Sequence, residues 1–266
     1  MLRSVKKLEG LTIGASDGAI GKVKDFYFDD EAWVVRYLVV DTGHWLAGRE
    51  VLISPYSIGQ VAWESETLPV NLTKAQIKNS PDIDTARPVS RQFERNYYAY
   101  YGYPYYWGGM GLWGGGYYPE VPLVGSGGDS YEGHRGHLRA PNEWNPDADP
   151  HLRSCNAVKG YHIRATDGDI GHVQGFIIED ATWAIRYLIV NTSNWWVGHE
   201  VLVSPEWITD VNWSQSVVSI DVDQKAIRNS PVYDPTVPLG RELEGALYRH
   251  YGRSTYWRDP LARAVA

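Results

Sequence analysis

Apolar residues follow a strand-like pattern in a stretch of the chain that occurs twice. The stretch covers residues 17–55 and recurs without a gap at residues 167–205. Residues 20–28 and 33–41 are rich in β-branched and aromatic side chains, which favours β-strands. Both faces of residues 33–41 are largely apolar, which predicts a strand that is covered on both sides or lies in a closed barrel. The repetition indicates that one fold was made twice.

Turn residues divide each copy into short strands followed by helices. Further strands are predicted at residues 50–54, 58–63 and 67–72, the pattern of a small sandwich or barrel. Thr73 and Gln76 form a capping box, which predicts a short helix that ends before Pro81. A second helical pattern follows in each copy, with apolar residues four positions apart at 93, 97, 101 and at 243, 247, 251. We therefore predict a mainly β fold with two tandem small antiparallel barrels, each followed by short helices.

The repeat also sets the predicted domain boundaries. These are a first barrel, a helical and aromatic extension, a linker, a second barrel and a second extension, at residues 1–85, 86–107, 108–155, 156–235 and 236–266. Residues 97–119 contain no charged side chain and are dominated by Tyr, Trp and Gly. This composition is typical of a flexible, sticky linker. Docking on the chain's own barrels or on a partner, and contact with a membrane surface, are the alternatives.

Composition and charge narrow the function classes. The net charge of −7 disfavours nucleic acid as a partner, because affinity for phosphates depends on clustered Lys and Arg. The single cysteine, Cys155, excludes a disulfide within the chain and fits a reducing, cytoplasmic compartment. The first residues lack the apolar region of a signal peptide, and no apolar run approaches the roughly 20 residues that span a bilayer as a helix.

No motif predicts catalysis, a cofactor or a metal site. Cys155 is interpreted as a small structural residue and not as a catalytic thiol, which would need a His partner. His134 and His137 have a spacing that a metal could use, but a structural zinc site needs four ligands, so a solvated loop is the preferred interpretation. Asp167 and Asp169 are interpreted as a hairpin turn, because the spacing of a calcium loop is missing. We therefore expect a non-enzymatic protein without cofactor or metal.

Residues that match between the copies are assigned to turns and core. This structural set is Asp17, Gly18, Gly21, Trp33, Arg36, Glu50, Asp167, Gly168, Gly171, Trp183, Arg186 and Glu200. Arg36 and Glu50 lie on neighbouring predicted strands, so we expect them to pair across the sheet, as do their counterparts Arg186 and Glu200. Trp33 is placed on the main strand, in the core.

Aromatic residues outside the strands are the candidate partner-binding residues, because Trp and Tyr are favoured anchors of interfaces. They are Trp45, Trp195 and Trp196 in polar loops, and Tyr105, Tyr106 and Trp107 in the aromatic extension. Contact with the other barrel of the same chain is the alternative for the loop residues. Since the matched residues specify scaffold, we expect partner specificity where the copies differ, at Trp196, His172 and the linker.

The order of these motifs resembles the PRC-barrel domain. The resemblance rests on Asp-Gly-x-x-Gly-x-Val-x-Asp-Phe, then Trp-x-Val-Arg-Tyr-Leu-Val-Val-Asp-Thr-Gly, then Gly-x-Glu-Val-Leu ending in Ser-Pro. It covers residues 10–85 and 160–235. Members of the family include the cytoplasmic part of the photosynthetic reaction-centre H subunit, a ribosome maturation factor and stand-alone bacterial proteins. The resemblance implies a small β-barrel used for docking or assembly.

The expected function is therefore a cytoplasmic docking or assembly module that binds another protein or itself. A homo-oligomer and a pseudo-dimer within one chain are both open. One alternative is a peripheral membrane assembly factor on the cytoplasmic face of the inner membrane, similar to the reaction-centre H subunit. The other is a ribosome- or RNA-associated factor, which the acidic charge disfavours.

Overall fold

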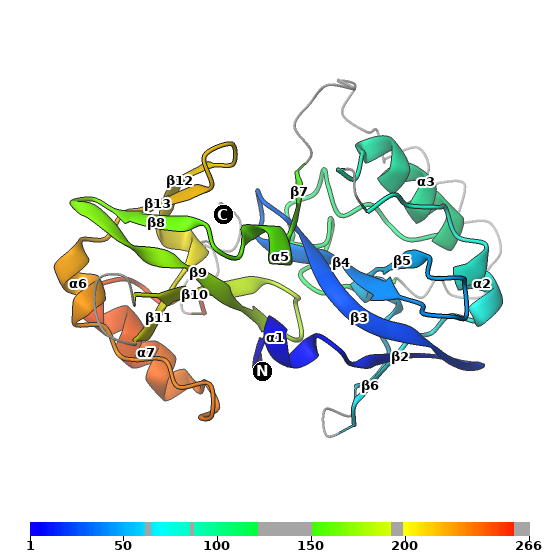
Figure 1. Ribbon diagram of the computed structural model, residues 1–266, viewed down its shortest axis with the longest axis horizontal. Helices are drawn as coiled ribbons and strands as arrows, with labels where there is room; N and C mark the ends of the chain where they lie inside the picture. The colour runs from blue at the N-terminus through cyan, green and yellow to red at the C-terminus, as the bar shows by residue number, and fades with distance from the viewer. Residues whose placement is uncertain (62–64, 86–87, 122–150, 193–198, 258–266) are drawn as a thin grey trace. The chain divides into compact units, whose positions relative to one another are not determined.

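Two mixed β-sheets carry most of the regular structure of the protein (Figure 1). The computed structural model describes residues 1–61, 65–85, 88–121, 151–192 and 199–257. The mainly β fold predicted from the sequence is confirmed.

One sheet has six strands in the order β5-β4-β3-β2-β6, with β7 paired to β3. The strands are β2 (Thr12–Ala15), β3 (Gly18–Asp29), β4 (Val34–Asp41), β5 (Glu50–Ile53), β6 (Thr67–Pro69) and β7 (Leu152–Ser154). Seven consecutive residues of β4 are buried, from Val34 to Val40, as its two apolar faces predicted. The strand predicted at residues 58–63 is reduced, within the described residues, to a single bridge between Ile58 and Val70.

The other sheet has seven strands and repeats this order as β11-β10-β9-β8-β13-β12, with β1 paired to β9. The strands are β1 (Leu2–Ser4), β8 (His162–Ala165), β9 (Gly168–Glu179), β10 (Ile185–Asn191), β11 (Glu200–Val203), β12 (Ile208–Asn212) and β13 (Val217–Ile220). Among the described strands neither order closes into a ring. Of the two arrangements predicted for residues 33–41, the structure therefore shows a strand covered on both sides.

Short helices lie between and after the strands of each copy. They are α1 (Val5–Leu8), α2 (Lys74–Lys78), α3 (Arg91–Tyr101), α5 (Cys155–Val158), α6 (Gln224–Arg228) and α7 (Arg241–His250), with 3-10 turns η1 (Pro55–Ser57) and η2 (Pro205–Trp207). The predicted capping box at α2 is confirmed. The Thr73 hydroxyl accepts from the Gln76 backbone N–H at 3.2 Å, and the Gln76 side chain accepts from the Thr73 N–H at 2.8 Å.

The chain divides into two compact units that cross the boundaries of the sequence repeat. Unit 1 consists of Met1–Gly10, Lys24–Arg36 and Arg153–Ala266, and unit 2 of Leu11–Val23 and Tyr37–Leu152. Inside unit 1, β1 pairs antiparallel with β9, which places Leu2 opposite Glu179. Val34 forms a further bridge to Ala184 in the same unit. The domain boundaries predicted at 1–85 and 156–235 follow the sequence repeat and stay predictions.

Two matched glycines allow close approach of backbone segments. A Cβ atom on Gly21 would lie 2.1 Å from the carbonyl oxygen of Asp41, and one on Gly171 would lie 2.0 Å from that of Asn191. No side chain fits at such distances, so only glycine is compatible with these two crossings.

Candidate binding site

The aromatic extension packs on the first sheet. In unit 2, the Tyr97 hydroxyl donates to the Leu52 carbonyl at 3.0 Å and accepts from the Ser54 N–H at 3.1 Å, which attaches α3 to β5 (Figure 1). Trp113 is 3% exposed, and its carbonyl accepts from the Tyr56 hydroxyl at 3.4 Å. Of the alternatives for residues 97–119, docking on the chain's own sheet is the one seen. The flexible linker was the wrong choice here, because tyrosines bury their rings while their hydroxyls bond to backbone.

A buried carboxylate lies at the centre of this packing. Glu94 is 2% exposed and accepts hydrogen bonds from Tyr37 at 3.1 Å and Tyr106 at 2.7 Å. Arg91 forms an ion pair with its other oxygen at 2.9 Å. Burial raises the pKa of Tyr37 well above its ordinary value, with Tyr98 and Glu94 adding to the shift. The phenol therefore stays protonated and able to donate.

The same group recurs in unit 1. Glu244 is 1% exposed and accepts from Tyr187 at 2.8 Å and Tyr256 at 3.0 Å, while Arg241 pairs with it at 3.0 Å. The arginine and the two hydroxyls already compensate the charge of this buried carboxylate, and a substrate cannot reach it. The group connects α3 to β4 and α7 to β10, the strands that carry Tyr37 and Tyr187. Sequence reasoning missed it, although all four residues match between the copies.

The predicted partner-binding residues of the extension differ in how far they are buried. Tyr106 is 4% exposed and belongs to the Glu94 group. Tyr105 and Trp107 are half-buried and stack with ring centroids 4.5 Å apart. The Arg91 guanidinium covers the Trp107 ring at 4.4 Å from its centroid. The structure thus brings the three residues together, but Tyr106 is enclosed by its own unit.

Among the three candidate tryptophans in loops, Trp45 is the one that the structure describes. Trp45 is half-buried and has the Lys74 ammonium 5.4 Å from its ring centroid. Trp195 and Trp196 lie outside the described residues, as do His134 and His137. His172 is half-buried on β9, opposite Asn191 on one side and His162 on the other.

The arginine–glutamate pairing expected from the sequence is wrong. Arg36 pairs with Asp29 at 3.0 Å, whereas Glu50 lies opposite Asp41 in the register of β4 and β5. In the second copy, Arg186 likewise pairs with Glu179 at 2.5 Å, and Glu200 lies opposite Asn191. The strand register explains why the arginine and the glutamate do not pair. In each copy the glutamate lies five residues away from the position opposite the arginine on the neighbouring strand.

The two matched tryptophans precede their strands and do not lie on them. Trp33 has a φ of 52° and Trp183 a φ of 59°, so both occupy left-handed turn positions. Trp183 is buried at 3% exposure, whereas Trp33 is only half-buried and stacks on Phe28 at 5.1 Å. The strand placement predicted for Trp33 is therefore corrected by one residue, since β4 begins at Val34.

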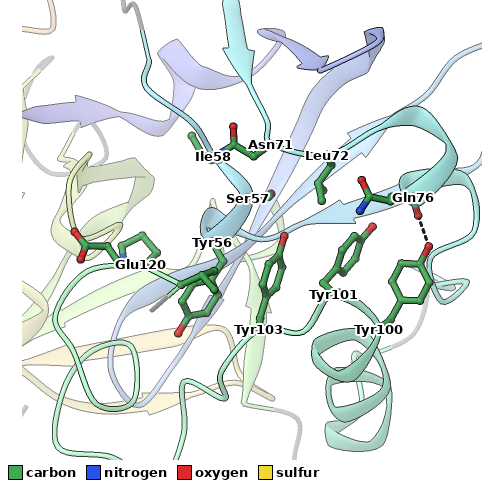
Figure 2. A pocket seen from close by; sticks show the side chains of 12 residues that line it. Tyr56, Ser57, Ile58, Asn71, Leu72, Gln76, Tyr100, Tyr101, Tyr103 and Glu120 are labelled. Carbon is green, nitrogen blue, oxygen red and sulfur yellow. Dashed lines mark hydrogen bonds between the residues drawn. The ribbon is translucent and has the colours of Figure 1, made fainter. Parts of the chain in front are cut away.

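A pocket of about 750 Å³ opens beside the aromatic extension in unit 2 (Figure 2). Four tyrosines form a row along it. The ring centroids of Tyr56 and Tyr103 are 5.3 Å apart, those of Tyr103 and Tyr101 are 5.3 Å apart and stacked, and those of Tyr101 and Tyr100 are 4.8 Å apart. The other lining residues are Ser57, Ile58, Asn71, Leu72, Gln76, Pro119, Glu120 and Val121. Figure 2 shows Glu120 beyond Tyr56, at one end of the row.

The electrostatics of this pocket are simple. Burial raises the pKa of Tyr103 to about 12 and that of Tyr101 further. The hydroxyls of these two tyrosines are therefore neutral at physiological pH. Glu120 is the one formally charged residue among those that line the pocket.

The pocket is lined by a small residue where the second copy has a large one. Ser57 in η1 matches Trp207 in η2, and Trp207 is 3% exposed with its ring 4.6 Å from that of Tyr251. Tyr103 matches Arg253, whose guanidinium bonds to the Asp221 carbonyl at 2.7 Å. Trp207 thus packs on Tyr251 in the second copy, and Tyr103 packs on the matching Tyr101 in the first. Sequence reasoning missed the pocket, although the Ser57 and Trp207 difference at matched positions was visible.

Other candidate sites carry little chemistry. Cys155 is buried, and burial together with nearby Asp25 raises its thiol pKa well above the usual value, so the reactive thiolate is disfavoured. Within the described ranges no group of three or more His, Cys, Asp or Glu side chains is arranged to hold a metal ion. In the same ranges no helix is long and apolar enough to cross a membrane.

Two sheets with the same strand order, each followed by a capped short helix and a longer aromatic helix, define a tandem protein of small β domains. Residues 2–77 match the PRC-barrel domain family, so the chain carries a PRC-barrel domain at these residues. This domain is a known type of protein-interaction module. The match does not extend to the second copy, whose sheet nevertheless repeats the strand order. A comparison with curated proteins finds no match.

Proposed function

We propose that this protein is a non-enzymatic docking protein that binds another protein through the tyrosine-walled pocket of its first copy. The observation that carries the proposal is the contrast between Ser57 and Trp207. One copy has a pocket of about 750 Å³ beside Ser57, and the other has a buried tryptophan at the matched position. The duplicated scaffold is shared, so a difference of this size at one matched position is where function separates the copies.

The composition of the pocket supports protein binding. Tyr and Trp are enriched among residues that dominate binding energy at interfaces, because they bury a large ring at low conformational cost. Tyr100 is 42% exposed and has its hydroxyl anchored on the Gln76 carbonyl at 2.8 Å, so its ring is presented in a fixed orientation. A preorganised wall of this kind reduces the entropy lost on binding.

The two buried glutamates, Glu94 and Glu244, do not support catalysis. Glu94 and Glu244 are each held by two tyrosine hydroxyls and an arginine, and both are nearly inaccessible. A catalytic acid or base must reach a substrate proton within hydrogen-bond distance. These two carboxylates act instead as structural connections between helix and sheet.

The test is affinity capture from the native cells, with chemical crosslinking, using the intact chain and a Ser57→Trp variant. The variant introduces the residue that the second copy already accommodates in the same turn. We expect a partner that the wild-type chain recovers and the variant does not. A Gln215→Trp variant, which adds an exposed tryptophan on the other copy, is the matched control and should recover the partner.

Equal recovery with Ser57→Trp and wild type would show that docking does not use the pocket. Thermal unfolding of both variants must accompany the capture, because a misfolded Ser57→Trp chain would also lose its partners. A Tyr100→Ala variant provides a second route, since this exposed ring can be removed without opening the core. Recovery of a differently tagged copy of the chain would identify the partner as the protein itself.

A further inference from the structure

The chemistry of the pocket identifies the part of the partner that enters it. The geometry points to an arginine side chain, carried on an extended segment of the partner protein, whose guanidinium lies against the tyrosine row and pairs with Glu120. This inference rests on the proposed docking function and deepens it. Nothing in the sequence repeat alone would select this ligand.

The charge of the lining favours a cation. Glu120 contributes the one formal charge of the pocket, and the tyrosines contribute π faces and neutral hydroxyls. Arg49, which acts electrostatically on Tyr101, is already bonded to the Asp82 carboxylate at 2.7 Å and to the Ser80 carbonyl at 2.9 Å. An anionic ligand would meet a carboxylate with no cation available on the wall. A cationic ligand meets complementary charge.

The form of the wall favours guanidinium over ammonium. A guanidinium is planar, more weakly hydrated than an ammonium, and stacks on aromatic faces. The stacked Tyr101 and Tyr103 rings are inclined by 10° with centroids 5.3 Å apart, and Tyr56 continues the row at 30° to Tyr103. Tyr101 and Tyr103 cover one face of each other, and Tyr100 at one end of the row is 42% exposed, so the row offers ring edges and outer faces to a flat cation.

The protein itself shows this mode of contact repeatedly. Arginine guanidinium carbons lie over aromatic rings at 4.4 Å for Arg91 on Trp107, 4.2 Å for Arg153 on Trp213 and 4.2 Å for Arg186 on Tyr256. The aromatic surfaces of both units are therefore built to receive guanidinium groups.

The second copy offers the most direct argument. There, Arg253 takes the place of Tyr103 and bonds to Asp221 through its carbonyl at 2.7 Å and its carboxylate at 2.9 Å. The residue that matches Asp221 in the first copy is Asn71, which lines the pocket. In the second copy a guanidinium, 39% exposed, thus occupies the position that Tyr103 holds beside the pocket in the first copy. A guanidinium supplied by a partner would find the Asn71 amide where Arg253 finds Asp221.

The size of the pocket indicates more than a lone side chain. Its volume of about 750 Å³ lies in the range that holds a ligand of several residues or a drug-sized molecule. Ile58, Pro119 and Val121 add apolar lining beside the polar groups, and they suit the residues that flank the arginine.

The experiment uses fluorescence anisotropy with the full chain and two labelled peptides. One has the sequence Gly-Ser-Arg-Gly-Arg-Ser-Gly, and the other carries citrulline in place of both arginines. Citrulline keeps the shape of arginine and removes the charge. We expect the arginine peptide to bind about tenfold more tightly than the citrulline peptide, with the difference reduced at high salt.

The variants assign this difference to the pocket. Glu120→Gln should weaken binding of the arginine peptide about fivefold and leave the citrulline peptide unchanged. Glu66→Gln removes the same charge from an exposed position outside the pocket and should change neither. Ser57→Trp should abolish the preference for arginine, since it fills the space.

Equal affinity for the two peptides, or an arginine preference that survives both Glu120→Gln and Ser57→Trp, would overturn the inference. Binding that occurs only after residues 122–150 are deleted would also overturn it, because the occupant would then be the chain's own segment with Arg135 and Arg139. If partner capture depends on Ser57 while the peptides show no preference, the docking function stands and the arginine assignment fails. If capture is also independent of Ser57, both fail.

Discussion

Tyr37 donates a hydrogen bond of 3.1 Å to Glu94, a residue 57 positions further along the chain. Tyr187 and Glu244 repeat this relationship at 2.8 Å. The bond attaches α3 to β4 and α7 to β10. Because the tyrosine walls of the pocket continue directly from this helix in the first copy, the position of the pocket depends on the bond as well.

The Glu94 carboxylate should contribute strongly to stability. Glu94→Gln keeps the size of the side chain but removes the charge that Arg91 and two phenols share. We expect the free energy of unfolding to fall by about 1–3 kcal/mol, the usual cost of disrupting buried bonds to a charged group. Urea unfolding followed by tryptophan fluorescence measures this, with the exposed Glu66→Gln as control. An unchanged midpoint would contradict the assigned structural role.

The neighbouring tyrosines of the extension should differ sharply. Tyr106→Phe removes a hydroxyl that bonds to Glu94 at 2.7 Å and should cost about 1.5–3 kcal/mol. Tyr105→Phe changes a half-buried ring next to Trp107 and should stay within about 0.5 kcal/mol of wild type. Both values come from the same urea titration. Similar losses for the two variants would show that the Glu94 group does not distinguish them.

Gly21 and Gly171 should tolerate no side chain. Gly21→Ala would place a Cβ 2.1 Å from the Asp41 carbonyl oxygen, so the two backbone segments must separate. We expect a loss of about 3 kcal/mol, at the upper end of the cost of overpacking. Gly115→Ala is the control, because a Cβ there meets no atom within 4 Å. The melting temperatures of the variants test this expectation. Equal melting temperatures for Gly21→Ala and Gly115→Ala would refute the close approach.

The matched arginine pairs should be unequal in strength. The Arg36 and Asp29 side chains are 2% and 9% exposed, whereas those of Arg186 and Glu179 are 19% and 18% exposed. Arg36→Met leaves a buried carboxylate without its cation and should cost about 3–5 kcal/mol. Arg186→Met should cost about 1 kcal/mol, since water screens the remaining charge.

A double variant separates the arginine pair from the packing of its side chains. Replacing both Arg36 and Asp29, as Arg36→Met with Asp29→Leu, should restore part of the loss, because no unpaired charge remains buried. Differential scanning calorimetry measures the melting temperatures of the single and double variants. A double variant less stable than Arg36→Met alone would show that the pair itself is not the source of the loss.

Glu179 should make stability depend on pH in the acid range. Burial raises its pKa, but Arg186 outweighs this through charge and a hydrogen bond and holds the pKa below the ordinary 4.5. A carboxyl with a lowered folded-state pKa stabilises the fold above its unfolded-state value, and this contribution disappears as the pH falls through the folded-state value. Urea unfolding from about pH 6 to about pH 3 should therefore show a shallower decline for Glu179→Gln than for wild type. The exposed Glu242→Gln should keep the wild-type slope.

Two structural features were predicted correctly from the sequence. The pattern at residues 33–41 predicted a strand with two covered faces, and Thr73 with Gln76 predicted the start of α2. Both depend on residues close together in the chain. The cross-sheet partner of Arg36 was wrong, because a pairing register is set by the sheet as a whole and not by the type of the residue. The flexible-linker interpretation of residues 97–119 failed for a similar reason, since composition does not show that tyrosine hydroxyls find backbone partners.

The sequence by itself therefore determined the duplication, the β class, the PRC-barrel motif and the helix caps. Each of these is written in periodic or adjacent side chains, whose conformational preferences act locally. Only the tertiary structure decided the pairing of β1 with β9, the Glu94 group and the tyrosine-walled pocket. These depend on contacts between residues that are far apart in the chain, such as Tyr37 with Glu94 and Tyr56 with Trp113. The pocket beside Ser57 likewise depends on how the rings of Tyr101 and Tyr103 pack near this residue.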